Sequence, residues 1–137
     1  MLRKSLLLLL VIAGLQARAT HFSGGEIYWD CLGNNQYRIT MVVYRDCAGI
    51  NVDPSVTLQL NSPCGNTSLI VTTPGGVEIS QLCGAELPNS TCNGGTLPGI
   101  QQYIYTGVVT LAPCNSWTIS YTNIYRNNAI VNLQNPG

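Results

Sequence analysis

Six cysteines constrain the fold of this chain more than any other feature of its 137 residues. None of them form the close C-x-x-C pairs that present two sulfur atoms to one zinc ion, so we expect no metal centre. An even number of cysteines in an exported chain is typical of a disulfide framework. The sequence therefore predicts a disulfide-stapled domain whose candidate bonding residues are Cys31, Cys47, Cys64, Cys83, Cys92 and Cys114.

The N-terminus supports export. A short basic segment, Arg3-Lys4, precedes an apolar run over residues 6–15, and Ala17-Arg18-Ala19 then supplies small residues at the positions that signal peptidase reads. The apolar run is about half as long as the roughly 20 residues that a membrane-spanning helix needs. We therefore expect residues 1–19 to be a cleaved signal peptide and residues 20–137 to form one secreted or cell-surface module.

The charges that remain after cleavage exclude two classes of partner. Residues 20–137 carry three arginines, no lysine and all six acidic residues of the chain. Binding to nucleic acid or to an anionic membrane surface requires clustered basic side chains. We therefore expect neither nucleic-acid binding nor binding to an anionic membrane surface. No second apolar stretch of spanning length follows the signal peptide, so we expect no membrane insertion after its removal.

Two cysteine pairings can be weighed by geometry. Gly33-Asn34-Asn35 is typical of a hairpin turn, which places Cys31 beside the turn and Cys47 at the far end of the returning strand. That separation disfavours a bond between those two residues. Cys83 and Cys92 bracket a turn-rich loop that closes easily, so we favour their pairing. The rest of the connectivity stays open.

Hydrophobic periodicity indicates strands throughout residues 20–137. In the segment 36–44, four apolar positions alternate onto one face, as expected of a strand with one face more buried. Clusters of Gly, Pro and Asn separate the candidate strands, and no stretch shows helical periodicity. We therefore predict an all-β fold, an antiparallel, Ig-like β-sandwich. Its expected strands are residues 26–31, 36–44, 55–60, 68–73, 76–80, 101–111, 116–123 and 129–133.

The last expected strand, 129–133, is followed at once by the turn signal Gln134-Asn135-Pro136-Gly137. This arrangement indicates a chain cut short, with more strands or domains originally following. The alternative is a natural end with a frayed tail.

Candidate catalytic residues are few. The one histidine, His21, lies two residues into the expected mature chain, and no G-x-S-x-G nucleophile motif is present. Acidic residues could bind calcium or hydrolyse a glycosidic bond only if they converged, and the sequence does not concentrate them. We therefore expect a non-catalytic protein without cofactor or metal. The acids concerned are Asp30, Asp46 and Asp53 for calcium, and Glu26 facing Glu78 or Glu86 for hydrolysis.

Aromatic residues offer a candidate ligand site. Tyr103 and Tyr105 lie on one face of an expected strand, and Trp117 and Tyr121 lie on one face of another. An exposed aromatic row could stack on sugar rings, so Tyr103 and Tyr105 are possible glycan-stacking residues. The competing interpretation is that these side chains pack in the core, as aromatic residues in strands commonly do.

Three motifs near the start of the mature chain carry a family resemblance. They are the block His21-Phe22-Ser23-Gly24-Gly25-Glu26-Ile27, the segment G-N-N-Q-Y-R-I-T at 33–40 and Y-R-D-C at 44–47. Together they resemble the N-terminal region of large Bacteroidetes secreted and cell-surface proteins. Many of those proteins carry PKD or Ig-like repeats and a gliding-motility-associated C-terminal sorting domain, which this chain lacks. The resemblance implies a surface location and further domains of the same polypeptide, and it supplies no ligand or catalytic residue.

Three functions are compatible with these observations. The leading hypothesis is a structural or adhesion-type module of a bacterial cell-surface protein, an adhesin whose partner is a surface glycan or protein. The second is a carbohydrate- or calcium-binding β module. The third is an extracellular hydrolase, which would need two acids across a cleft.

Overall fold

The computed structural model describes residues 22–122, and these residues are almost entirely strand and turn. The expected strand at 129–133 and the predicted signal peptide lie outside the described residues. Two short 3-10 helices, η1 (Leu87–Asn89) and η2 (Thr91–Asn93), interrupt the loop before the sixth strand. The strands are β1 (Phe22–Gly33), β2 (Gln36–Asp46), β3 (Ser55–Ser62), β4 (Gly65–Thr72), β5 (Gly76–Glu78), β6 (Ile100–Thr110) and β7 (Thr118–Ser120).

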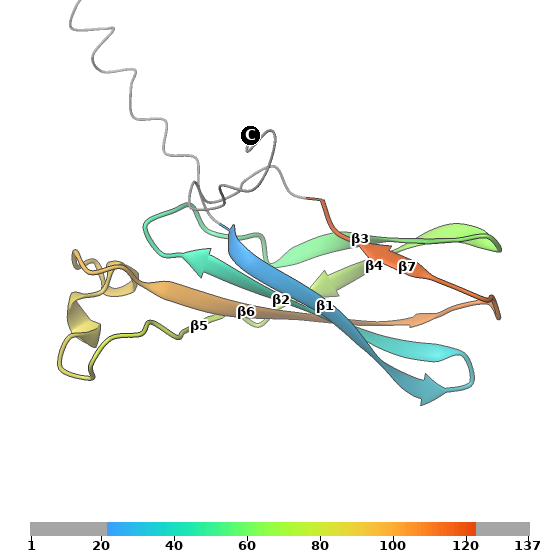
Figure 1. The fold of residues 1–137 in the computed structure, drawn as a ribbon, viewed down its shortest axis with the longest axis horizontal. Helices are drawn as coiled ribbons and strands as arrows, with labels where there is room; N and C mark the ends of the chain where they lie inside the picture. Colours follow the sequence, from blue (N-terminus) through green and yellow to red (C-terminus); the bar gives the residue numbers. More distant parts are fainter. Residues whose placement is uncertain (1–21, 123–137) are drawn as a thin grey trace, which may run out of the picture.

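The strands form two antiparallel layers (Figure 1). One layer contains β1, β2, β6 and β5, and the other contains β4, β3 and β7. A single pair, Thr72 with Thr106, joins β4 to β6 and so links the two layers. Gly107 permits this contact, because a side chain there would come within 3.0 Å of the Ile70 carbonyl oxygen. The predicted all-β, antiparallel sandwich class is confirmed.

The core lies between the two layers. Alternate residues of β2 (Ile39, Met41 and Val43) meet Leu58 and Leu60 of β3, as the two-residue periodicity predicts. The strand β2 differs from the expectation in one respect: Thr40 and Val42, on its opposite face, are also buried. β2 lies between β1 and β6 along its whole length.

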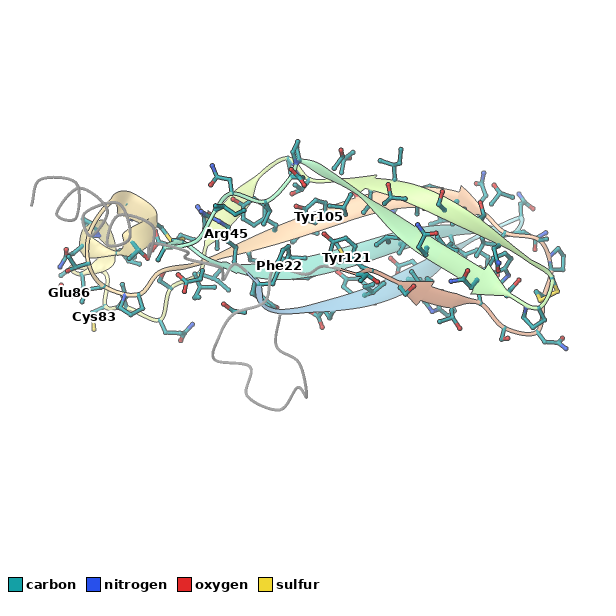
Figure 2. The ribbon with its side chains drawn as sticks, turned by 90° about the horizontal axis from the view of Figure 1, so that it is seen from above. Phe22, Arg45, Cys83, Glu86, Tyr105 and Tyr121 are labelled. Carbon is teal, nitrogen blue, oxygen red and sulfur yellow. A yellow bond between two sulfur atoms is a disulfide. The ribbon has the colours of Figure 1, made fainter. Side chains whose placement is uncertain are left out.

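A buried arginine holds the loop after β2 against the sheet. Arg45 is 7% exposed, and its guanidinium donates hydrogen bonds to the carbonyl oxygens of Ile50 at 2.7 Å and Gly49 at 2.6 Å. A third hydrogen bond runs to Oε1 of Gln101 on β6 at 2.7 Å. All three nitrogen atoms of the guanidinium therefore donate hydrogen bonds within the fold (Figure 2).

The turn between β1 and β2 has the predicted conformation. Gly33, Asn34 and Asn35 all have positive φ, at 90°, 51° and 60°. Glycine and asparagine tolerate this region better than other residues, and two successive positive φ values match the right-handed twist of a hairpin. The turn places Cys31 at the hairpin end of the molecule and Cys47 at the other.

Two disulfides form, and their pairing differs from the favoured one. Cys47 bonds Cys92, with a Cα–Cα distance of 4.8 Å, and Cys64 bonds Cys114, at 5.9 Å. The predicted Cys83–Cys92 bond is wrong. The two 3-10 turns fold the loop back on itself, and Gly99 packs against Cys92 while its carbonyl oxygen accepts a hydrogen bond from the Cys47 amide. These contacts bring Cys92 to Cys47.

Cys31 and Cys83 are unpaired and exposed, which corrects the assignment of all six cysteines to disulfides. They lie toward opposite ends of the long layer. Cys31 pairs with Tyr37 of β2, which in turn pairs with Val109 of β6. Cys83 comes after β5, whose last residue pairs with Gln101 of β6. The stretch of β6 between those two residues spans about 27 Å, far more than the roughly 6 Å that a disulfide allows.

Candidate binding surface

The outward side of the longer layer carries several exposed apolar residues among its polar ones. The strand register places Tyr28 of β1, Val42 of β2, Ile104 and Val108 of β6, and Val77 of β5 on the side that faces away from the core. Except for Val42, these side chains are exposed, from 43% for Ile104 to 67% for Val77. We call these five residues the apolar outer face. Val42, in contrast, is only 3% exposed.

The sequence of β6 explains why this side is apolar. Its inward positions are apolar, as in an ordinary half-buried strand, with Tyr103, Tyr105 and Val109 packed on or in the core. Its outward positions would then be polar, yet Ile104 and Val108 occupy two of them. The residues expected from the sequence to bind a ligand do not include this face. The signal that could have revealed it is that apolar residues occupy both alternating sets within one strand.

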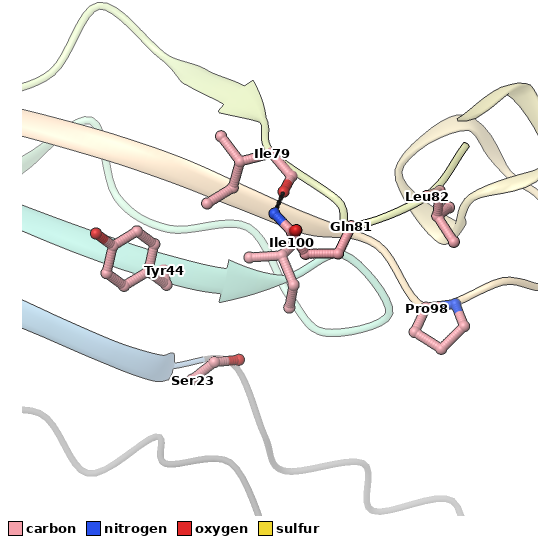
Figure 3. Close-up of a pocket in the computed structure, with 7 residues that line it drawn as sticks. All are labelled: Ser23, Tyr44, Ile79, Gln81, Leu82, Pro98 and Ile100. Atoms are coloured by element: carbon pink, nitrogen blue, oxygen red, sulfur yellow. Dashed lines mark hydrogen bonds between the residues drawn. The ribbon is translucent and has the colours of Figure 1, made fainter. Parts of the chain in front are cut away.

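A shallow apolar pocket of about 560 Å³ continues the apolar outer face at one end of the layer. Figure 3 shows its walls, with the ring of Tyr44 on one side and Leu82 and Pro98 on the other. Ile79 and Ile100 form its floor, where the Ile79 amide donates to the Ile100 carbonyl oxygen at 2.9 Å. Ser23 and Gln81 add the polar groups. Apolar walls with few hydrogen-bonding groups favour burial of an apolar group from a partner.

A hydrogen-bond network centred on Glu78 fixes the loop that forms this end of the pocket. Its Oε1 atom accepts a hydrogen bond from Ser80 Oγ at 2.7 Å, and its Oε2 atom accepts one from Asn93 Nδ2 at 2.9 Å. Ser80 Oγ in turn accepts the amide hydrogen of Ile100 at 3.0 Å. Hydrogen bonds from Ser90 and Ser80 lower the pKa of Glu78, so this carboxylate stays ionised and acts as a structural acceptor.

The predicted glycan-stacking residues do not form an exposed row. Tyr105 is 1% exposed and lies between the layers (Figure 2), where its hydroxyl donates to the Asp53 carbonyl oxygen at 2.6 Å. Burial raises the pKa of Tyr105 to about 12. Tyr103 packs against the core and lies over Gly76, where a side chain would come within 2.4 Å of the tyrosine ring. The core-packing interpretation is correct for both.

The second aromatic pair is also structural. Trp117 and Tyr121 are partly buried against the core. The Trp117 indole donates to the Ala112 carbonyl oxygen at 3.2 Å, and the ring of Tyr121 lies 6.4 Å from that of Phe22. This contact joins the last described segment to the start of β1 (Figure 2).

The acids proposed for calcium do not converge. Asp30, on β1, lies opposite Arg38 of β2. Asp46 is the last residue of β2, and its Oδ1 atom accepts a hydrogen bond from the Ala48 amide at 2.9 Å. The backbone of Asp53 is held by Tyr105. Within residues 22–122, no group of three or more His, Cys, Asp or Glu side chains is placed to hold a metal ion.

The acids proposed for glycoside hydrolysis do not face one another either. Glu26 shares the outward side of the layer with Val42, whereas Glu78 is in register with Gln101 on the other set of positions. Glu86 lies in the end loop beside Cys83 (Figure 2). His21, the remaining catalytic candidate, lies outside the described residues.

No helix among the described residues is long and apolar enough to cross a membrane. The two disulfides fit an oxidising, extracellular environment. Comparisons with known protein families, with curated proteins and with solved structures find no match to this chain.

Proposed function

We propose that this chain is a non-catalytic structural or adhesion-type module of a secreted or cell-surface bacterial protein, and that it docks on an apolar protein surface through the apolar outer face. One observation carries the proposal. A sheet fixed at both ends by disulfides exposes Tyr28, Val77, Ile104 and Val108 on one side, continuous with an apolar pocket. Exposed apolar patches of this kind on exported domains mark interaction sites.

The chemistry of the face favours protein over glycan. Sugar recognition needs many hydrogen-bonding groups beside its stacking ring, whereas the pocket offers mainly the aliphatic side chains of Ile79, Leu82 and Ile100. Protein interfaces, in contrast, have apolar centres with polar rims. The resemblance of residues 21–47 to Bacteroidetes surface proteins supports a location outside the cell and a partner there, including further domains of the same polypeptide.

A carbohydrate-binding function is the second candidate, and one residue supports it. Tyr44 lines the pocket beside Gln81 and gives it one aromatic ring and one amide. Tyr103 and Tyr105 no longer support this function, because they serve the core.

A binding comparison tests the proposal. The mature chain is fluorescently labelled and applied to whole bacterial cells and to a glycan array, beside the variants Ile104→Asp and Ile70→Asp. Ile104 and Ile70 are both exposed isoleucines in strands, but Ile70 projects from the opposite layer. We expect Ile104→Asp to lower cell binding at least tenfold and Ile70→Asp to leave it unchanged.

Two results would contradict the proposal. Equal loss in both variants would mean that the apolar outer face is not the binding site. Specific binding on the glycan array, removed by Tyr44→Ala, would favour the carbohydrate function instead.

A further inference from the structure

The longest strand of the fold has an open edge. Among the described residues, β1 pairs with β2 and with no other strand, so within residues 22–122 the second side of its Gly24–Cys31 stretch has no sheet partner (Figure 1). From Gly24 to Cys31 its register with β2 is unbroken. The edge strand of the other layer, β7, is only three residues long. The open edge of β1 is therefore the one long site of this kind within residues 22–122.

Of the usual protections of an edge strand, this segment carries only charge, from Glu26 and Asp30. Natural sheets block edges with charged side chains, proline, bulges or short strands, because an open row of N–H and C=O groups recruits other strands. Between Gly24 and Cys31 there is no lysine and no proline, and the register shifts lie outside that stretch. A long open edge is the structural basis of recognition by strand addition.

The side chains along β1 define the chemistry of an added strand. Glu26 and Asp30 are exposed on the outward side, with the exposed Tyr28 between them. On the inward side, Trp29 is 59% exposed, although its ring meets that of Tyr37 at 5.7 Å. A strand beside β1 would therefore place two residues, four positions apart, next to the acids and an apolar residue against Trp29.

We propose that the open edge of β1 binds an extended peptide segment of a partner protein that carries two basic residues four positions apart on one side and apolar residues on the other. Opposite charges across neighbouring strands stabilise their pairing, and like charges oppose it. The excess of acidic over basic residues in 20–137 also favours encounter with a basic partner.

The same acids disfavour a second copy of this chain on the edge. In the antiparallel register centred on Tyr28, Glu26 of one copy would face Asp30 of the other, in both halves of the pairing. The edge is thus open to a basic strand and repels its own copy in that register. This inference concerns the edge of the sheet and does not depend on the apolar outer face.

The probes for the test are two synthetic peptides of nine residues. Both alternate valine with polar residues, and both carry charge at the third and seventh positions, as lysine in one and as glutamate in the other. Each peptide is titrated into the full oxidised chain, while the exchange of individual amide hydrogens is followed by NMR. We expect the lysine peptide to bind about tenfold more tightly than the glutamate peptide. It should slow exchange specifically at amides between Gly24 and Cys31.

Variants make the charge requirement specific. Glu26→Lys with Asp30→Lys should reverse the preference of the two peptides, and Glu26→Gln with Asp30→Asn should abolish it. Glu86→Lys, in the end loop, is the matched control and should leave the preference unchanged. If the double lysine variant does not fold, the Glu26→Gln, Asp30→Asn variant still decides the test, because it should bind both peptides equally.

Several outcomes would overturn the proposal. The first is equal binding of both peptides, and the second is slowed amide exchange that lies outside β1. The third is a dimer of the chain in which exchange of the β1 amides is slowed. The fourth is slowed exchange, in the free monomer, of the β1 amides that point away from β2. The last result would mean that another segment of the same chain occupies the edge. Ile104→Asp should still bind the lysine peptide, so failure of the proposed docking face and failure of the edge site are distinguishable.

Discussion

The two outward faces of this sandwich flank the same core but differ in chemistry. The longer layer presents the apolar outer face, whereas the shorter layer presents mainly hydroxyl and amide side chains, with Ile70 as the apolar exception. Those polar residues are Thr57, Gln59, Asn61, Asn66, Ser68, Thr118 and Ser120. Both layers contribute buried residues to the core, so the core alone does not account for the difference between their outward sides. It marks the longer layer as the side adapted for contact.

If the outward side of the longer layer is adapted for contact, its outward residues should be dispensable for folding and its inward residues should be essential. Matched pairs of residues can test that division. In each pair one residue holds the fold together, and the other lies on the outward side of the longer layer or in the exposed loop beside it.

The largest expected effect comes from the disulfides, which lie at the two ends of the sandwich. Replacing Cys47 and Cys92 by serine, or Cys64 and Cys114 by serine, should each lower the free energy of unfolding by about 4 kcal/mol, because the closed loops have similar lengths of 45 and 50 residues. Urea denaturation measures this loss. Thiol labelling of the native oxidised chain should modify Cys31 and Cys83 alone.

Only one of the two disulfides belongs to the apolar side. Loss of Cys47–Cys92 should also change the NMR signals of the pocket residues Tyr44 and Ile100, because Cys92 anchors the loop that carries Pro98. Loss of Cys64–Cys114 should leave those signals in place. The same change in both variants would show that the pocket depends on overall stability and not on its own loop.

Two arginines give the next largest contrast. Arg45→Met removes three hydrogen bonds and leaves the carbonyl oxygens of Ile50 and Gly49 without their donor, so we expect a loss of about 3 kcal/mol in unfolding free energy. Arg38→Met, on the exposed outward side, should change it by less than about 0.5 kcal/mol. A large effect of Arg38→Met would mean that the outward side supports the fold.

Two tyrosines sharpen the division further. Tyr105→Phe should cost about 1 kcal/mol, because the hydrogen bond from the buried tyrosine to the Asp53 carbonyl oxygen is lost, whereas Tyr28→Phe should be neutral. The pKa of Tyr105 is raised to about 12 from an ordinary value of 10, so the folded state keeps this proton longer than the unfolded state. The contribution of Tyr105 to the free energy of unfolding should therefore be fully present below pH 10 and be lost as the pH rises toward 12. In Tyr105→Phe this part of the alkaline loss should disappear.

The sequence predicted the strands better than the surfaces. All seven described strands overlap expected segments, because two-residue alternation and Gly, Pro and Asn turns are local signals. The pairing of Cys92 was not predictable in this way, since it depends on how two 3-10 turns fold a loop whose composition indicates only that it is a loop. Tyr103 and Tyr105 were ambiguous for a related reason: alternation shows that two residues share a face, but not whether that face points inward.

The smallest expected effect concerns the loop beside the pocket and pairs Glu78 with Glu86. Because hydrogen bonds lower the pKa of Glu78 in the folded state, its contribution to stability is present above the ordinary carboxylate pKa and is lost as the pH falls through the lowered value. Glu78→Gln should remove that acid dependence and speed amide exchange at Asn93 and Ile100, which the network holds. Glu86→Gln, the exposed acid of the same loop, should alter neither. If both variants leave exchange unchanged, the Glu78 network does not hold the pocket wall, and the Cys47–Cys92 bond and the backbone hydrogen bonds of the loop hold it instead.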